Sequence, residues 1–509
     1  GAAANPYRVS GWLISAAPAS GLQLRNARAH VVVRDCEVTA ATVAGFYLFG
    51  VTNATLANVT AYAGSGEGVR IESSQGIVLT ASTLTASLSG AVVLDSSGVQ
   101  VRGNNITLNV VDGVAVTASP FVRIEDNNVT LNGVGNAGYG VHLASTTNDT
   151  VRGNRFVRNG IFLDGTAAVH FDSHTITPDN LVSGLPILYE RRCSGLGLSG
   201  LQIGSLLVAS CRHVSLTNLS VAQGDVGIEL GFATDVTIGP NVTISDTATG
   251  IRTFGSSGVR VLESAILDAG YGIVIDASTG VRISGSKLSA PSPLALPFDG
   301  VVIRASDQVN LTGNVVRHHR NAIDSATSGN VSLVGNVIGL DAVGFHADGS
   351  RDLTVVGNLF VQDGSGLRFL NVVNATVSLN EILGAFEDGA NLSASTGVRT
   401  FHNRFSGSAK NAYDDSPAGN AWDGGYPAGG NYWGNYRGVD VFHGPSQNLS
   451  GADGIGDTPY LFDVGARDRY PLMVAPVSRD VPPEALFAVS PAAGNVRTDF
   501  SVSANLSSD

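Results

Sequence analysis

The side chains with the clearest potential for chemistry lie near the C-terminal end of the chain. Asp453 and Asp457 flank a Gly-Ile-Gly segment, and Asp440 lies a short distance before them. Carboxylate oxygens are hard ligands that suit Ca²⁺. The spacing differs from that of an EF-hand loop, and Asp side chains also cap tight loops by accepting backbone hydrogen bonds. The pattern therefore predicts either a calcium site or a hydrogen-bonded loop.

The same region is rich in aromatic residues. Residues 413–470 contain two of the three Trp and six of the twelve Tyr in the chain. Trp422, Tyr432 and Trp433 lie beside Asp and Asn residues, an arrangement that suits stacking on a sugar ring. Aromatic residues also cover the apolar end of a repetitive β-structure. We therefore expect a capping segment here, with sugar binding as the alternative.

The rest of the chain offers few residues for catalysis. His170, Asp172 and His174 alternate along the sequence, so on a β-strand they would share one face and could ligate a metal. With two Lys, one Met and three Cys, the chain has little material for a basic catalytic centre or a soft copper site. We therefore assign no catalytic residue, and calcium is the one cofactor that the sequence suggests.

The elements that must position these side chains follow from an internal repeat. A run of alternating apolar residues is followed by Gly-Asn or a small polar pair, as in residues 101–106, and the pattern returns about every 22 residues. This period with such short strands suits one coil of a parallel β-helix, whose coils stack about 4.8 Å apart. The stretch between Asn154 and Asn218 has the length of about three coils, so we expect one continuous solenoid.

The Asn of each repeat has a structural explanation. An inward-facing Asn at a bend lies above and below its counterparts in neighbouring coils, and its amide can both donate and accept hydrogen bonds along the axis. The Gly before it permits the left-handed backbone of the bend. The same spacing extends the column to Asn58, Asn218 and Asn241. The predicted structural ladder contains Asn104, Asn127, Asn154, Asn314, Asn336, Asn358, Asn380 and Asn403.

Composition agrees with this architecture and excludes several others. The 509 residues include 63 Gly, with 43% hydrophobic and 14% charged residues and a formal net charge of −12. Sparse charge with high apolar content is the reverse of a disordered composition, and abundant Gly disfavours a helix bundle. The acidic balance argues against nucleic acid as a partner, and no apolar run is long enough to span a membrane. The sequence therefore predicts an all-β parallel β-helix.

Cysteines and glycosylation sequons bear on the compartment. Cys193 and Cys211 are 18 residues apart, so they either bridge neighbouring coils or serve as small buried apolar residues. Asn-x-Ser/Thr sequons fit a secreted glycoprotein, and a chain rich in these residues also produces them by chance. We expect an extracellular or cell-surface location. The predicted glycosylation sites are Asn53, Asn58, Asn105, Asn128, Asn148, Asn218, Asn241, Asn310, Asn330, Asn374, Asn391, Asn448 and Asn505.

Several segments resemble a known family. The strongest match runs from residues 411–415 to 468–472 and includes Gly-Asn-Tyr-Trp at residues 430–433 and Asp-Gly-Ile-Gly-Asp-Thr-Pro-Tyr at residues 453–460. Residues 5–12 also fit. These motifs are similar to those of the NosD-type right-handed parallel β-helix family, whose carbohydrate-binding and sugar-hydrolase-like repeats are abundant in archaeal surface proteins. Residues 482–509 resemble the opening strands of a PKD-type immunoglobulin-like domain.

The resemblance implies an organisation and a function. We expect a right-handed parallel β-helix over residues 1–410, a capping segment over 411–473, and a linker with the first PKD-like strands over 474–509. The favoured function is a structural or adhesive cell-surface module, a glycosylated rod in a surface layer or filament. Its partners would be further copies, other envelope proteins or glycans. A carbohydrate-binding or polysaccharide-degrading protein is the first alternative, and a NosD-like accessory protein for copper-enzyme maturation is the second.

Overall fold

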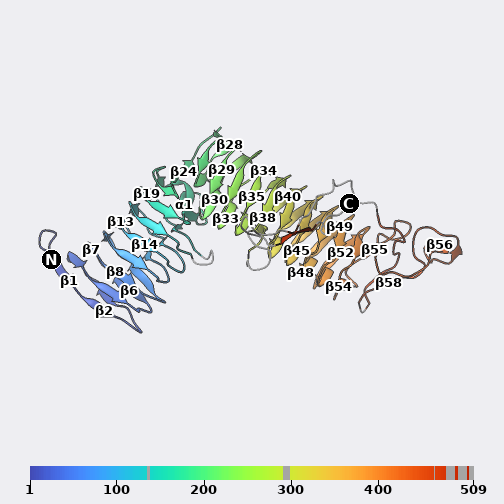
Figure 1. The fold of residues 1–509 in the computed structure, drawn as a ribbon, viewed down its shortest axis with the longest axis horizontal. Helices are drawn as coiled ribbons and strands as arrows, with labels where there is room; N and C mark the ends of the chain where they lie inside the picture. The colour runs from blue at the N-terminus through green and yellow to red at the C-terminus, as the bar shows by residue number, and fades with distance from the viewer. Residues whose placement is uncertain (134–137, 291–297, 464, 477–487, 491–500, 504–509) are drawn as a thin grey trace.

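Short parallel β-strands make up nearly all the regular structure of this chain. The computed structural model describes residues 1–133, 138–290, 298–463, 465–476, 488–490 and 501–503. The strands wind into an elongated rod (Figure 1), and strands of successive coils pair in register, as Val101 does with Ile124. Such register stacks like residues on like and buries one apolar row per strand. The predicted right-handed parallel β-helix is confirmed.

The first stack of coils, the N-terminal unit, contains three sheets. One has eight strands, from β1 (Tyr7–Ser10) to β22 (Thr175–Ile176). Another has seven, from β3 (Leu22–Arg25) to β21 (Ile161–Asp164). The remaining one runs from β2 (Leu13–Ser15) to β23 (Leu181–Val182). The inward Val, Leu and Ile residues of these strands form one apolar core.

The second stack, the C-terminal unit, repeats this plan. Ten strands run from β25 (Gly197–Ser199) to β52 (Thr396–Phe401), and eleven run from β26 (Gln202–Ile203) to β55 (Tyr432–Trp433). A further sheet, called here the front sheet, runs from β24 (Leu185–Arg191) to β54 (Lys410–Asp414). This unit has a separate apolar core.

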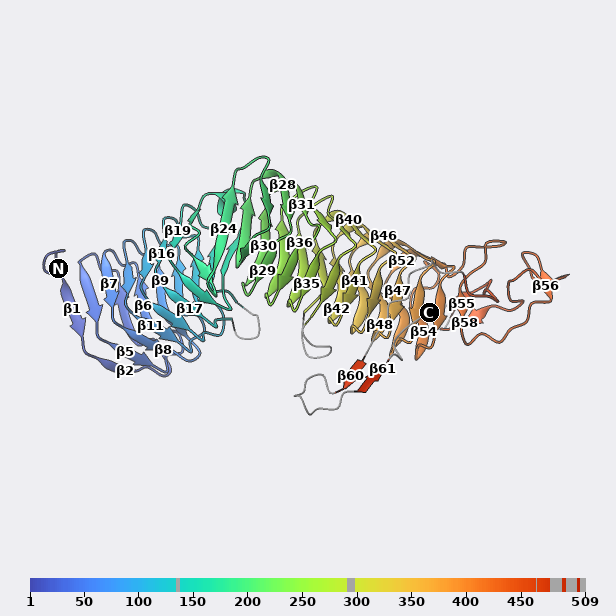
Figure 2. The ribbon, with the colours of Figure 1, turned by 45° about the horizontal axis from the view of Figure 1, so that its top comes forward.

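The stack of coils is interrupted between the two units. After β21 the chain forms a short helix, α1 (Val169–Asp172), then β22 and β23, and β24 runs antiparallel to β23. This reversal ends one set of sheets and starts another, and the rod bends near β24 (Figure 2). The solenoid expected over residues 1–410 is thus interrupted once among the described residues, where α1 and the antiparallel pair replace regular coils.

Asn side chains form a column at the first bend, which follows the strands of the eight- and ten-stranded sheets. The main-chain N–H and Nδ2 of Asn314 donate to Oδ1 of Asn336 at 2.9 and 3.0 Å, and Asn336 repeats this with Asn358. Asn180 and Asn431 extend the two columns by one coil each. The eight predicted residues all lie in these columns: Asn104, Asn127, Asn154, Asn314, Asn336, Asn358, Asn380 and Asn403.

Three residues expected in this column lie outside it. Asn58, Asn218 and Asn241 are exposed, and each has a left-handed backbone with φ between 52° and 59°. The apolar residue that follows each of them takes the inward position. Asn is favoured at both places for different reasons, since it tolerates the left-handed region as well as forming amide ladders. The repeat was therefore read one residue out of register in these coils.

The other two bends carry polar columns as well. At the second bend of the N-terminal unit, Nδ2 of Asn109 donates to Asn132, and Nδ2 of Asn132 donates to Asn159. In the C-terminal unit the equivalent positions include Asp341 and Asp363, which lie five residues after their ladder Asn just as Asn132 does. The third bend of that unit carries a serine column of Ser256, Ser278, Ser306, Ser328 and Ser350.

Aromatic side chains close the far end of the C-terminal unit. Trp433 stacks on Phe405 at 4.7 Å and on Tyr460 at 4.4 Å, and Trp422 packs beside it. The predicted aromatic-rich cap is confirmed. Of the predicted PKD-like strands, β60 (Ala488–Ser490) and β61 (Ser501–Ser503) pair antiparallel, and most of the remaining residues of 474–509 lie outside the described residues.

Candidate functional site

A group of charged side chains lies at the junction of the two units. Here the outer face of the front sheet, at β27 (Ser205–Ala209), β30 (Val226–Gly231) and β33 (Thr249–Phe254), covers the end of the N-terminal unit. Phe171 of α1 packs against Phe232 and Phe254 with ring centroids 5.4 and 5.5 Å apart. The junction therefore combines an apolar contact with a polar one.

Arg252 is the centre of the polar contact. Its guanidinium donates to Oε1 of Glu229 at 2.8 Å, to the main-chain carbonyl of Leu163 at 2.9 Å and to Oδ1 of Asp164 at 3.1 Å. Oε2 of Glu229 in turn accepts from the main-chain N–H of Leu163 at 3.1 Å. β21 is the last strand of its sheet, so Leu163 has no neighbouring strand to pair with there. The Glu–Arg pair satisfies the backbone groups that a further coil would otherwise satisfy.

Burial sets the electrostatics of this pair. Glu229 is 1% exposed and Arg252 is 8% exposed. Desolvation raises the pKa of the Glu229 carboxyl to about 7, and the adjacent Arg252 guanidinium opposes that rise. Desolvation also raises the pKa of Asp276, whose Oδ2 lies 3.8 Å from Nε of Arg252. One guanidinium therefore faces three carboxyls, those of Glu229, Asp164 and Asp276.

Asp225 closes the adjacent part of the same edge. Its Oδ2 accepts from the main-chain N–H groups of Gly140 and Gly160 at 2.6 and 2.7 Å, and its Oδ1 lies 3.4 Å from Nδ2 of Asn159. Desolvation raises the pKa of Asp225 to about 7, and the two N–H donors oppose this. Asp225 thus accepts a hydrogen bond from Asn159, the last residue of the second-bend Asn column of the N-terminal unit.

Aromatic rings and a histidine surround the cluster. Phe162 lies between the ring of Tyr139, stacked at 4.0 Å, and the guanidinium of Arg252, 4.5 Å from its centroid. Nδ1 of His142 lies 3.4 Å from Oδ2 of Asp112. The charged groups are thus already paired with each other or with the backbone, and what they do chemically is hold two sheet ends together.

Neither Glu229 nor Arg252 was identified as functional from the sequence. Each is a lone charge inside an apolar strand, and the two are direct neighbours in the register of β30 and β33. Opposite charges one coil apart at the same strand position are the signal that could have indicated a buried pair. Their partner Leu163 is 66 and 89 residues away in the sequence, so no local pattern indicates what they bind.

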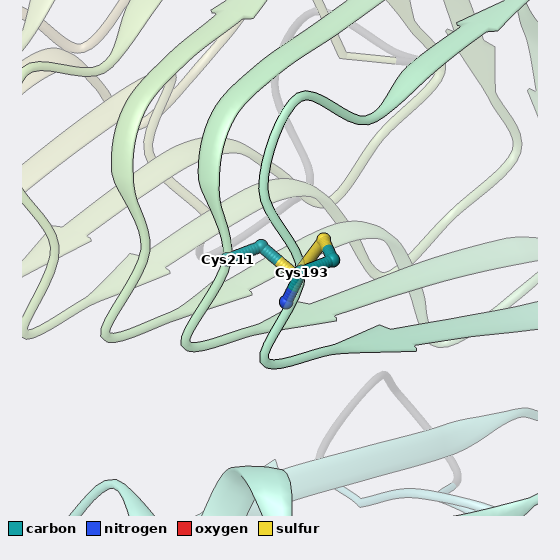
Figure 3. The surroundings of a disulfide bond; sticks show 2 residues. All are labelled: Cys193 and Cys211. Carbon is teal, nitrogen blue, oxygen red and sulfur yellow. A yellow bond between two sulfur atoms is a disulfide. The ribbon is translucent and has the colours of Figure 1, made fainter.

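Cys193 and Cys211 form a disulfide between the first two coils of the C-terminal unit (Figure 3). Of the two alternatives that the sequence left open, the bridge is the one observed. Cys36 is free and buried. Disulfides persist in oxidising compartments and are rare in the cytosol.

Comparison with known families agrees with the geometry. Residues 20–178 match a model described as right handed beta helix region, and residues 241–438 match a model described as periplasmic copper-binding protein (NosD). This chain is a right-handed parallel β-helix protein. A search of curated proteins found no match. No helix among the described residues is long and apolar enough to cross a membrane.

Several solved structures are similar to this β-helix protein at low identity. The periplasmic alginate epimerase AlgG matches with 13% identity, 74% coverage of this chain, 77% of that chain and a TM-score of 0.31. The A-module of the mannuronan C-5 epimerase AlgE4 from Azotobacter vinelandii matches with 13% identity, coverages of 66% and 87% and a TM-score of 0.29. Bacteriophage CBA120 tailspike protein 3 matches with 13% identity, coverages of 83% and 60% and a TM-score of 0.28. Such low values carry no information about substrate.

The residues of the β-helix protein do not fit the copper of the NosD description. Copper(I) favours soft Cys and Met ligands. Cys193 and Cys211 are joined to each other, and Sγ of Cys36 lies 3.2 Å from the main-chain carbonyl of Arg34. Among the described residues, no three His, Cys, Asp or Glu side chains group in a way that could hold a metal ion.

The three predicted calcium ligands are used by the backbone. Asp440 accepts from the main-chain N–H groups of Asp453 and Gly454 at 3.0 and 2.8 Å. Asp453 accepts from the N–H of Ile455 in its own loop, and Asp457 accepts from the N–H groups of Val441 and Phe442. The described part of the chain does not bring these carboxylates together as a ligand set. The hydrogen-bonded loop, the other alternative from the sequence, is the arrangement observed, because these turns leave N–H groups that need acceptors.

Two of the predicted sugar-stacking residues are inside the cap. Trp422 and Trp433 are 2% and 1% exposed, and their indole N–H groups donate to Asp414 and Asp468 at 2.9 Å. Tyr432 is half-buried. The sugar platform expected from Trp422, Tyr432 and Trp433 is therefore corrected, because closing the core uses the faces of both indoles.

The His170, Asp172 and His174 group also differs from its expected form. Residues 169–172 are helical, so the three do not alternate along one strand face. His174 is buried, with Nδ1 accepting from the N–H of Asp149 and Nε2 donating to the carbonyl of His170 at 2.8 Å. Asp172 pairs with Arg192 at 2.8 Å. These side chains are used in packing the end of the N-terminal unit and do not converge on one point.

The predicted glycosylation sites lie at the surface wherever the structure describes them. Ten of the twelve described sequon Asn residues are exposed, and Asn310 and Asn391 are half-buried. Asn505 lies outside the described residues. Several of these Asn have positive φ, among them Asn53 and Asn374 at 60°. Because Asn tolerates this backbone conformation better than most residues, its presence there is explained without a glycan. Glycosylation stays a prediction.

Proposed function

We propose that this chain is a structural and adhesive module of a cell-surface protein, a bent rod that spaces or displays neighbouring parts of an envelope. The observation that carries this proposal is the junction. Two buried charges of the junction, Glu229 and Arg252, are directed at the free edge of β21. Charged side chains that join two stacks of coils stabilise the shape and rigidity of the rod. In a catalytic cluster, such side chains would instead line an open cleft that a substrate could enter.

The location is part of the proposal. The disulfide between Cys193 and Cys211 favours an oxidising compartment, and the exposed sequons favour the outside of a cell. The sequence resemblance adds an archaeal surface layer or filament, with a PKD-like domain next along the chain. Further copies or other envelope proteins would be the partners.

Imaging of the native envelope tests this proposal most directly. Cryo-electron tomography of cells that carry the protein with an added epitope tag should show labelled density in a repeating lattice or filament. A scaffold role would be contradicted if the labelled density showed no regular arrangement or lay only inside the cell.

A carbohydrate-binding function is the second candidate, favoured by one row of the front sheet. One outward side chain from each successive strand forms this row, and each member is half-buried. The row consists of Asp324, His346, Arg368, Asn391 and Tyr413. Polar side chains that repeat about every 4.8 Å along the rod offer a row of hydrogen-bonding groups to an extended glycan.

A glycan array with the intact chain tests the second candidate. Binding that Arg368→Ala and Tyr413→Ala abolish, and that the exposed Arg351→Ala retains, would support a sugar-binding face. Incubation with the bound glycan then separates binding from cleavage, since only a hydrolase or lyase would shorten it. Absence of binding across the array would leave the scaffold role alone.

A further inference from the structure

The second bend of the C-terminal unit contains acids where the N-terminal unit has amides. Asn132 accepts at Oδ1 from the N–H of Asn109 and donates from Nδ2 to Asn159. Asp363 accepts at Oδ1 from the N–H of Asp341 at 3.1 Å, which reproduces the first of these bonds. The carboxyls therefore take the place of the Asn amides in the column.

The same column extends upward to a histidine. The N–H of His319 donates to Oδ1 of Asp341 at 2.6 Å, and Nδ1 of His319 lies 3.6 Å from that oxygen. Each of the three side chains is at most 4% exposed. One coil of about 4.8 Å separates each from the next.

What the Asn side chains of an Asn column have, and Asp341 and Asp363 as carboxylates lack, is a side-chain donor. Where Asn has Nδ2, Asp341 and Asp363 have Oδ2, and both of these oxygens are buried with no hydrogen-bond partner among the described residues. Two ionised carboxylates stacked one coil apart in an apolar core repel each other and lose their hydration. A proton on one of them removes that charge and makes an O–H that can donate as Nδ2 does.

Among the described residues, no cation lies within the column to neutralise the two carboxyls. His319 stands on one side of Asp341 and Asp363 on the other, and beyond Asp363 the column continues with an alanine. Burial raises the pKa of both Asp well above the usual range, and it outweighs the main-chain hydrogen bonds and the charge of Arg317, which lower the pKa of Asp341. Burial lowers the pKa of His319 to about 4, against the attraction of Asp299, so the ring is neutral near neutral pH. Asp299 itself is paired with Arg320 at 2.6 Å.

We propose that Asp341 and Asp363 share a proton that substitutes for the Asn amide hydrogens, and that losing this proton loosens the second bend between residues 319 and 363. The bend is then a pH-sensitive element built into the rod. The sign follows from the raised pKa. The stabilisation is fully present below the unfolded-state pKa of about 4, and it is lost as the pH rises through the folded-state pKa.

The test replaces Asp341 and Asp363 by Asn, the residue that occupies the equivalent positions of the N-terminal unit. Asp341→Asn/Asp363→Asn should make the melting temperature less dependent on pH than in the unmodified protein. We expect the fall in melting temperature between about pH 5 and about pH 9 to be smaller by about 4 °C or more. Asp95→Asn, which removes an exposed carboxyl in the N-terminal unit, should keep the full fall. A double variant whose melting temperature follows the unmodified protein across this range would overturn the proposal.

A measurement on the unmodified protein decides the matter even if the double variant does not fold. The N–H groups of His319 and Asp341 donate to the two carboxyls, so their hydrogen exchange reports the bend. After correction for the intrinsic rate, protection at these two amides should fall about tenfold or more between about pH 5 and about pH 9. The equivalent amides of Asn109 and Asn132, whose acceptors are the side-chain amides of Asn132 and Asn159, should keep theirs. Equal behaviour of the two pairs would refute a shared proton.

Discussion

Replacing Arg252 by methionine measures how much the junction contributes to holding the rod together. Methionine keeps much of the apolar volume of the side chain and removes the donors to Glu229, Asp164 and the Leu163 carbonyl. Glu229, at 1% exposure, would then face the edge of β21 without its cation. The change therefore isolates the electrostatic part of the junction from its packing.

The expected loss of stability is large for one substitution. Removing one partner of a buried ion pair costs about 3–5 kcal/mol, because the remaining charge is left uncompensated. The Leu163 carbonyl also loses a donor, and an unsatisfied buried group costs about 1–3 kcal/mol. These terms overlap, so we expect about 3–5 kcal/mol in all. Arg304→Met, an exposed arginine of the same sheet, is the matched control and should change stability by less than about 0.5 kcal/mol.

Urea unfolding followed by circular dichroism compares the two variants, and hydrogen exchange localises the effect. The Leu163 amide, which donates to Glu229, should lose protection in Arg252→Met and keep it in Arg304→Met. The reasoning is refuted if both variants unfold at the same urea concentration and the Leu163 amide stays equally protected.

Three further predictions concern the ladder, the cap and the disulfide. Asn336→Leu should destabilise by about 1–3 kcal/mol in urea unfolding, since Asn314 loses its acceptor, whereas the exposed Asn105→Leu should change little; equal costs would contradict the ladder. Trp433→Ala should cost about 3–5 kcal/mol and open residues 434–473 to limited proteolysis, and unchanged digestion would contradict the cap. Reducing Cys193–Cys211, which closes a loop of 18 residues, should cost about 3 kcal/mol and lower the melting temperature, and a thiol-insensitive melt would show that the bridge contributes nothing.

The repeated units of this protein were predictable because each coil carries its own local signal. An Asn such as Asn336 follows a Gly and an apolar strand, and the coils above and below repeat the same pattern. Identical residues then stack on each other, so a one-dimensional period is enough to specify the column. The cap was predictable for a similar reason, since the aromatic residues that close the end are clustered in the sequence.

Errors arose where one residue type serves two purposes. Asn58 and Asn241 resemble ladder residues by spacing, but the backbone there needs a left-handed residue one position before the inward one. Trp422 and Trp433 suit a sugar platform by type, but composition does not say which way a ring faces. Asp453 and Asp457 suited a metal by type, and only the loop conformation shows that N–H groups take their oxygens.

The coil, its period, its apolar rows and the amide column at the first bend can be predicted from the sequence, because they depend on contacts between residues about one repeat apart. The interruption of the stack, the closure of the edge of β21 by Glu229 and Arg252, and the amide-like position of Asp341 and Asp363 are visible in the folded chain alone. The physical reason is distance along the chain. A free sheet edge must find its acceptors and donors wherever the fold brings them, here 66 and 89 residues away.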